Sequence, residues 1–123
     1  MRPDQRLRRP ADFDAVYRSA GKSGRTEGNR LLVVRTMPNG AEVTRFGFVT
    51  TKAVGNAVVR NRTKRRLRNI AQTLTIAPGL DIVISARKPA ADAPFAELQR
   101  AALKLLTRTG ALTEQAAPKF FCK

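Results

Sequence analysis

One basic segment, residues 55–68, constrains this chain more than any other part of it. Six of the nine residues from Arg60 to Arg68 are Lys or Arg, and none is acidic. At the helical period of about 100° per residue, this segment and the turns after it divide into two faces. The apolar face holds Val59, Leu67, Ile70 and Leu74, with Thr63 inside it and Arg66 at its edge, and the opposite face holds Arg60, Asn61, Lys64, Arg65 and Arg68. The pattern predicts a helix, ending near Thr75, that packs on a sheet and presents cations on its other side.

The surroundings of this segment favour a nucleic-acid partner over a merely solvated surface. No Asp or Glu occurs from Val43 to Leu80, a stretch of 38 residues that contains eight basic ones. Solvated helix faces usually mix charges of both signs, one turn apart. A helix lying on a membrane surface would carry aromatic residues on a broad apolar face, and this narrow stripe carries none. We therefore predict that the cationic face meets phosphate groups.

The charge and composition of the whole chain support the same class of partner. A net charge of +15 on 123 residues predicts binding to polyanions that weakens steeply as salt rises. The length and apolar content favour one folded domain. Cys122 is the only cysteine, so neither a disulfide framework nor a zinc cluster is expected. Without a signal-like segment or about 18 consecutive apolar residues, we expect a cytoplasmic protein without membrane contacts.

The remaining patterns predict an α+β fold with helices packed on a sheet of about four strands. The order is αββ(β)αβα, with room for an extra short strand near residues 50–53. The expected elements are a helix from Pro10 to Ala20 capped by Gly21, a loop over 22–29, strands over 31–37 and 43–51 joined as a hairpin, a strand over 80–86, and a helix over 95–109 capped by Asp92. Strand 80–86 is apolar at nearly every position, which predicts a central place in the sheet.

These elements predict one RNA-binding domain over residues 1–110 and a C-terminal tail over residues 111–123. The tail shows little periodicity, and Phe120-Phe121 either anchors it or leaves it frayed.

The polar residues do not form a recognisable catalytic set. The chain has no histidine, which removes the usual general base near neutral pH. Its nine carboxylates are scattered over different elements, and the close pair Asp12 and Asp14 falls on different sides of a helix. No Walker loop, nucleophile elbow or zinc pattern is present. We therefore expect a binding protein without catalytic residues, and the sequence identifies no metal ligand.

Aromatic side chains offer a second kind of contact, because bases of single-stranded nucleic acid stack on them. Phe13 and Tyr17 lie one turn apart on the first predicted helix. Phe46, Phe48 and Phe95 fit core positions better than a binding surface. Tyr17 is the better candidate for a half-exposed stacking ring, because its hydroxyl needs a polar partner. Periodicity alone leaves the assignment open.

Three separate segments carry the motifs of a known family. They read Leu7-x-x-x-x-Asp12-Phe13-x-x-Val16-Tyr17, then Lys52-x-x-Gly55-Asn56-Ala57-x-x-Arg60-Asn61-Arg62-x-Lys64-Arg65-x-x-Arg68, and finally Ala86-Arg87-Lys88-Pro89-Ala90. In this order they closely resemble the bacterial ribonuclease P protein component. The resemblance covers about residues 7–108.

The resemblance implies a fold like that of ribosomal protein S5 domain 2, with a left-handed crossover through the basic helix. It also implies the protein subunit of a ribonucleoprotein endoribonuclease, which binds a catalytic RNA and the 5′ leader of precursor tRNA. The RNA subunit would hold most of the Mg²⁺ and carry the hydrolysis that matures the tRNA 5′ end. The expected partners are these two RNAs, and neither DNA nor a membrane.

The resemblance also assigns residues to two RNA contacts. The catalytic RNA would be bound by Lys52, Asn56, Arg60, Asn61, Arg62, Lys64, Arg65 and Arg68. A cleft between the first helix and the sheet would hold the single-stranded leader with Phe13, Tyr17, Arg35 and Phe48. Arg35 stands where some relatives carry a stacking aromatic, and its guanidinium can stack or pair with phosphate. A ribosomal or RNA-chaperone protein without a role in cleavage is the alternative function.

Overall fold

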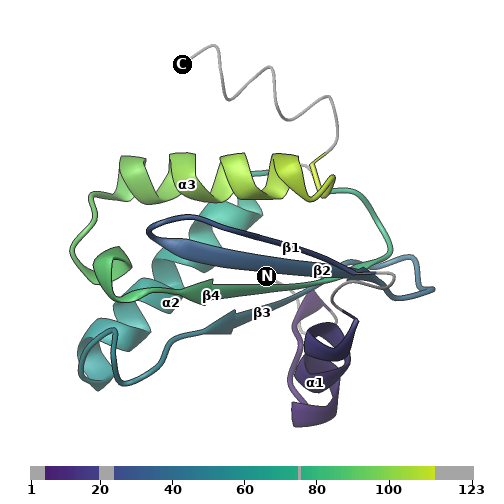
Figure 1. Cartoon of the computed structure of the whole chain (residues 1–123), viewed down its shortest axis with the longest axis horizontal. Coiled ribbons are helices and arrows are strands. Elements are labelled where there is room, and N and C mark those ends of the chain that lie inside the picture. The colour runs from purple at the N-terminus through teal and green to yellow at the C-terminus, as the bar shows by residue number, and fades with distance from the viewer. Residues whose placement is uncertain (1–4, 20–23, 75, 113–123) are drawn as a thin grey trace.

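The computed structural model describes residues 5–19, 24–74 and 76–112, in which helices pack on both faces of a four-stranded sheet (Figure 1). The elements are α1 (Pro10–Arg18), β1 (Arg25–Gly28), β2 (Leu32–Pro38), β3 (Arg45–Val49), α2 (Ala57–Gln72), β4 (Leu80–Ala86), the short 3₁₀ helix η2 (Lys88–Ala91) and α3 (Phe95–Arg108). This order confirms the predicted α+β class. Gly21, Thr75 and Phe120-Phe121, to which the sequence analysis assigned roles, lie outside the described residues.

The sheet has the strand order β1-β2-β4-β3, with β4 in the interior as predicted. β4 pairs with β2 in antiparallel and with β3 in parallel orientation. The predicted hairpin between β2 and β3 is therefore wrong, because β4 lies between them. All of β4 except its first residue and Ser85 is buried, and such a strand gains most where it is covered by neighbours on both edges.

Two smaller strand predictions also fail. Residues 25–28 were expected in a loop but form β1, which pairs antiparallel with β2 at the edge of the sheet. Its residues are polar or glycine and mostly exposed, so it lacks the apolar alternation that marks a strand. The optional strand near residues 50–53 does not form; the chain turns there instead, and Val54 N donates to Thr51 O at 3.0 Å.

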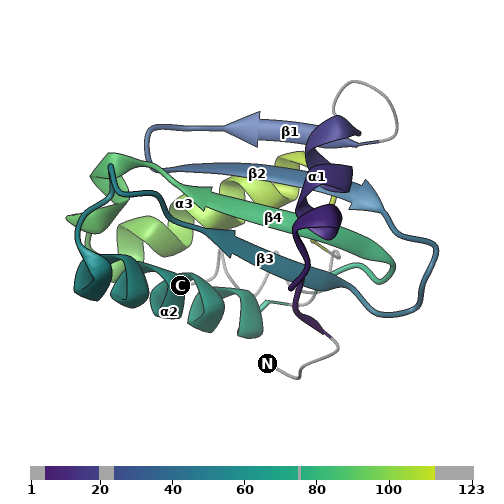
Figure 2. The same cartoon turned by 90° about the horizontal axis from the view of Figure 1, so that it is seen from below.

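Helix α2 connects the parallel neighbours β3 and β4 by a left-handed crossover. In Figure 2 both strands point to the left and β4 lies above β3, with α1 in front of the sheet. The buried side chains of α2 belong to the cluster on the opposite face, so the connection passes behind the sheet. The general preference for right-handed crossovers is therefore broken in this chain, as the resemblance implied.

The two faces of the sheet carry cores of different size. The larger core lies between the sheet and helices α2 and α3, and it includes Leu32, Ile82, Leu67, Ile70, Leu98 and Leu105. The smaller core lies under α1 and consists of Leu7, Val16 and Val83, with Phe13, Met37 and Val49 against them. Helix α1 therefore rests on a thin apolar layer, and part of this face of the sheet is left half-buried.

The predicted start of α3 needs one correction. The N-cap residue is Pro94, and no side chain caps the helix, so Asp92 does not have the capping role expected of it. Asp92 instead ends η2, where its backbone N–H donates to Pro89 O. Beyond α3 the packing continues, because Ala111 is fully buried and Leu112 pairs with Ile76.

Candidate nucleic-acid interface

The direction of α2 is set by the two residues that precede it. Asn56 is its N-cap, and its side-chain oxygen accepts a hydrogen bond from Val59 N at 3.0 Å. Gly55 has a φ of 155°, and a Cβ at this position would lie 2.9 Å from Val59 Cβ. Lys52, predicted to bind RNA, is exposed in the preceding turn. Asn56 therefore has a structural role, while its predicted RNA contact stays a prediction.

Helix α2 separates its apolar and cationic residues as its periodicity predicted. Thr63, Leu67 and Ile70 are buried against the sheet and α3, and Thr63 Oγ1 donates to Val59 O at 2.9 Å. On the other side, Asn61 and Arg65 are exposed and Arg60, Lys64 and Arg68 are half-buried. Within the described residues, none of the six cations of α2 forms an ion pair. The cationic face therefore keeps its full charge.

Arg62 and Arg66 differ from the other cations of α2, because both reach a protein acceptor. Arg62 Nη2 donates to Ala91 O at 3.4 Å, and Arg66 Nη1 donates to Ala93 O at 3.2 Å. The two guanidinium groups thereby tie α2 to the end of η2 and to the residues that follow it. Arg62 was predicted to bind RNA, and this hydrogen bond turns one of its donors toward the protein.

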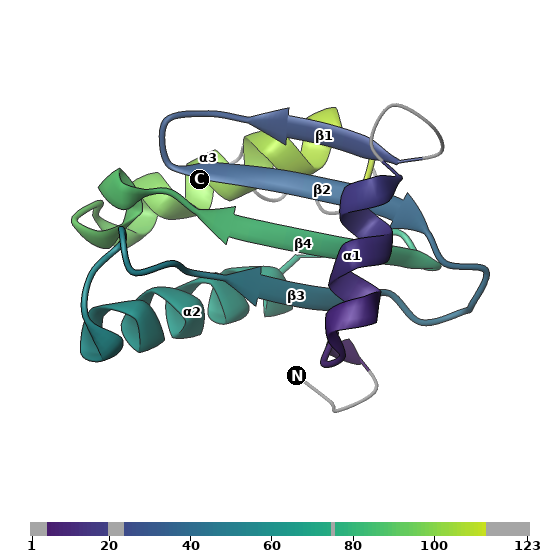
Figure 3. The same ribbon diagram turned by 60° about the horizontal axis from the view of Figure 1, so that its bottom comes forward.

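Helix α1 crosses β2, β4 and β3 near one end of the sheet, as Figure 3 shows. Phe13 of α1 lies directly over Gly47 of β3, and a Cβ at Gly47 would overlap its ring. The missing side chain at Gly47 therefore makes room for Phe13, which is half-buried and docks the helix on the sheet.

One turn further along α1, Tyr17 contacts Arg35 of β2. The guanidinium carbon of Arg35 lies 4.8 Å from the centre of the Tyr17 ring, a cation–π arrangement. Tyr17 is 38% exposed. The structure thus brings together Phe13, Tyr17 and Arg35, three of the four residues predicted to hold a single strand.

The fourth residue, Phe48, lies on the other face of the sheet. It is in register with Ile84 and packs against the larger core, and its ring stacks on Phe46 with centroids 6.0 Å apart. Side chains alternate between faces along a strand, so Gly47 faces α1 while Phe46 and Phe48 face away from it. The placement of Phe48 in a cleft beside α1 is therefore corrected to a core position.

A charged network, which the sequence analysis missed, holds α1 to the sheet. Arg45 of β3 donates to Asp81 of β4 through Nε and Nη2, at 2.9 and 2.7 Å, and lies 3.7 Å from Asp12 of α1. Asp81 is 1% exposed and also accepts from Asn39 Nδ2 at 3.0 Å. The hydrogen bond to Asp81 raises the pKa of Arg45 above its usual value. Only the pairing of β3 with β4 reveals this contact, because the two residues are far apart in sequence.

This network also limits the chemistry of the chain. Asp81 is hydrogen-bonded to Arg45, and Asp12 lies 3.7 Å from Arg45 and 3.8 Å from Arg9, so both carboxylates already face cations of the protein. Nowhere in the described segments do three or more His, Cys, Asp or Glu residues gather as a metal site would require. These residues do not fit a resident Mg²⁺ ion.

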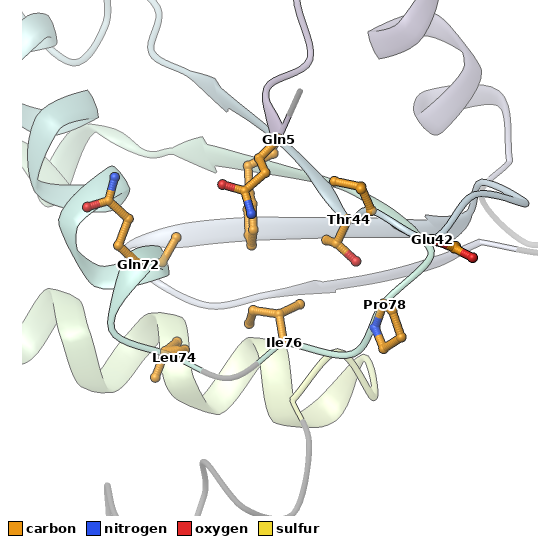
Figure 4. A pocket seen from close by; sticks show the side chains of 10 residues that line it. Gln5, Glu42, Thr44, Gln72, Leu74, Ile76 and Pro78 are labelled. Atoms are coloured by element: carbon orange, nitrogen blue, oxygen red, sulfur yellow. The ribbon is translucent and has the colours of Figure 1, made fainter. Parts of the chain in front are cut away.

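A cavity of about 630 Å³ lies at the far end of α2 from its N-cap (Figure 4). Its lining includes Gln5, Thr44, Gln72, Leu74 and Ile76, and its one charged side chain is that of Glu42. No cation of α2 lines this cavity, and the carboxylate of Glu42 repels phosphate, so the cavity is not part of the cationic face. None of the helices in the described part of the chain combines the length and apolarity that a bilayer crossing requires.

Comparisons with known proteins agree with this geometry. The family model described as ribonuclease P matches residues 1–110. The ribonuclease P protein component of Roseiflexus castenholzii is 41% identical over 113 residues, covering 89% of each chain, and that of Kocuria rhizophila is 45% identical over 97 residues, covering 77% of this chain and 82% of the relative.

Solved structures give the same result. The Staphylococcus aureus RNase P protein superposes with a TM-score of 0.78 at 30% identity, covering 89% of this chain and 98% of the other. The RNase P protein from Thermotoga maritima in complex with 1-(4-fluorophenyl)-2-thiourea gives a TM-score of 0.72 at 32% identity, covering 84% and 98%.

Proposed function

The chain belongs to the ribonuclease P protein component family, and from this premise we propose that it binds two RNAs through two separate surfaces. The cationic face of α2, with Lys52 before it, binds the catalytic RNA of ribonuclease P. The face of the sheet beside α1 binds the single-stranded 5′ leader of precursor tRNA. The protein so assists the endonucleolytic removal of the leader that forms the mature tRNA 5′ end.

The observation that carries this proposal is the row of cations along α2. Arg60, Lys64 and Arg68 are spaced by one helical turn, and no described carboxylate pairs with any of them. An array of this kind, held by a buried face on a folded sheet, displaces the counterions of an RNA backbone without reorganising. It binds by shape and charge, as expected for contact with a folded RNA.

The chain contributes binding and orientation rather than bond cleavage. It has no histidine, and its buried carboxylate Asp81 is bound to Arg45. The hydrolysis would belong to the RNA subunit, whose Mg²⁺ would supply the activation of water and the stabilisation of negative charge. The protein raises the affinity for precursor tRNA over mature tRNA, because only the precursor has a leader to fill the α1 side of the sheet.

Reconstitution tests this function directly. The chain is mixed with a bacterial ribonuclease P RNA and a precursor tRNA at a Mg²⁺ concentration too low for the RNA alone. We expect cleavage at the 5′ end of the tRNA only when both subunits are present, and tighter binding of precursor than of mature tRNA. A ribosomal or RNA-chaperone protein would bind RNA without restoring cleavage. Cleavage by the protein alone would contradict the proposal.

A further inference from the structure

Arg35 lies in an unusual environment for a cation. It belongs to the interior strand β2, in register with Val83 of β4 and Thr26 of β1, and its side chain is half-buried on the face that α1 partly covers. Its guanidinium carbon lies over the ring of Tyr17, 4.8 Å from the ring centre. A guanidinium carries five N–H donors, and no acceptor among the described residues takes a hydrogen bond from those of Arg35.

No carboxylate of the described residues pairs with this guanidinium. Asp12 of α1 and Asp81 of β4 both face Arg45 instead. Among the described residues Arg35 has the Tyr17 ring as its partner and no hydrogen bond or ion pair. A half-buried cation has lost part of its hydration, which costs free energy. An anion that binds to it forms charge-assisted hydrogen bonds in place of the lost water.

The two aromatic rings of α1 are less available to bases than their sequence suggests. The ring of Phe13 fills the space over Gly47, and the ring of Tyr17 is covered on one face by Arg35. Both rings therefore serve contacts within the protein on the side that faces the sheet. What this part of the molecule offers to a single strand is a guanidinium whose N–H donors have no described acceptor.

We propose that Arg35 binds a backbone phosphate of the single-stranded leader and that Tyr17 is the platform that orients it. At this point the leader is held through its backbone charge and not through the stacking of a base. Tyr17 is thus a positioning residue, and Arg35 is the residue that contacts RNA. The inference rests on the proposed binding of the leader beside α1 and specifies the chemistry of that site.

A leader with single neutral linkages separates phosphate binding from base stacking. Affinities are measured for the complex of this chain with the catalytic RNA, under conditions that prevent cleavage. One set of precursor tRNAs carries a methylphosphonate at one leader position at a time, and a second set lacks one base at a time. With the wild-type chain, we expect one methylphosphonate to weaken binding about tenfold. Loss of the adjacent bases should change it less than about twofold.

Variants then assign that phosphate to its partner. Arg35→Gln should weaken binding of the unmodified precursor about tenfold and abolish the additional penalty of the methylphosphonate. Tyr17→Leu keeps the charge of Arg35 but removes the ring that orients it. This variant should reduce the penalty of the same methylphosphonate without abolishing it. Arg100→Gln is the matched control, because it removes one exposed arginine from α3 and should leave the penalty unchanged.

The outcomes distinguish the inference from the function on which it rests. A methylphosphonate penalty that persists in Arg35→Gln would overturn the phosphate contact, as would a base-loss penalty that disappears in Arg35→Gln. In both cases the preference for precursor over mature tRNA would still stand. If the wild-type complex bound precursor and mature tRNA equally, the leader-binding function itself would be refuted, and the inference with it.

Discussion

Helix α2 and the sheet face beside α1 both present arginines, but they do so in opposite ways. On α2 six cations follow one another without a carboxylate partner among the described residues, so charge density dominates. Beside α1, Arg45 is hydrogen-bonded to Asp81, whereas Arg35 contacts the ring of Tyr17 and has no carboxylate partner among the described residues. The first surface is suited to sequence-independent contact with many phosphates. The second is suited to one oriented contact.

The largest expected effect comes from removing charge along α2. Replacing Arg60, Lys64 and Arg68 together by Gln should weaken binding of the catalytic RNA roughly a hundredfold at moderate salt, because about three phosphate contacts are lost. Filter binding or fluorescence anisotropy at one salt concentration measures this loss. The matched control replaces three exposed cations of α3, Arg100, Lys104 and Arg108, by Gln. It removes the same amount of charge from another surface. Equal losses in the two triple variants would mean that only net charge matters.

The next effect concerns the network beside α1. Asp81→Asn leaves Arg45 without its buried carboxylate and should lower the free energy of unfolding by about 2–3 kcal/mol. This value is below that for a fully buried ion pair, because the Arg45 side chain is 30% exposed and water screens its charge. Glu97→Gln is the control, because its pair with Arg30 is exposed and should cost less than about 1 kcal/mol. Denaturant unfolding measures both. Similar losses in the two variants would contradict the structural role given to the network.

The pH dependence of this network follows from the raised pKa of Arg45. A cation whose pKa is higher in the folded than in the unfolded state stabilises the fold fully below the unfolded value and loses this effect as the pH rises through the folded value. The loss therefore falls in strongly alkaline solution, above the usual pKa of arginine. Across neutral pH, the contribution of Arg45 should be constant.

A smaller effect separates the two faces of the sheet. Phe48→Leu should lower the free energy of unfolding by about 1 kcal/mol, because it loses the stack on Phe46 and part of the core contact. It should leave the preference for precursor over mature tRNA unchanged. Phe13→Leu should reduce that preference, because it loosens α1 over Gly47. Loss of the preference in Phe48→Leu would restore that residue to the leader site.

Features of the fold that depend on local periodicity could be predicted from the sequence, and those that depend on strand pairing could not. The faces of α2 and the interior place of β4 follow from local periodicity, and both were predicted correctly. The partners of Arg45, Phe48 and Arg35 depend on which strands pair and on which face α1 lies. The wrong hairpin between β2 and β3 hid that information, since it placed β4 outside the pair. The polar edge strand β1 carries too weak a pattern to be found.

The central claim is that the unneutralised cations of α2 meet RNA phosphates, and the salt dependence of binding tests it most directly. The slope of log affinity for the catalytic RNA against log salt is compared between the wild-type chain and Arg65→Gln, which changes one exposed side chain. We predict that the slope becomes shallower by about 0.7–0.9, the value for one lost phosphate contact. An unchanged slope would contradict the claim, because Arg65 would then not contact the RNA backbone.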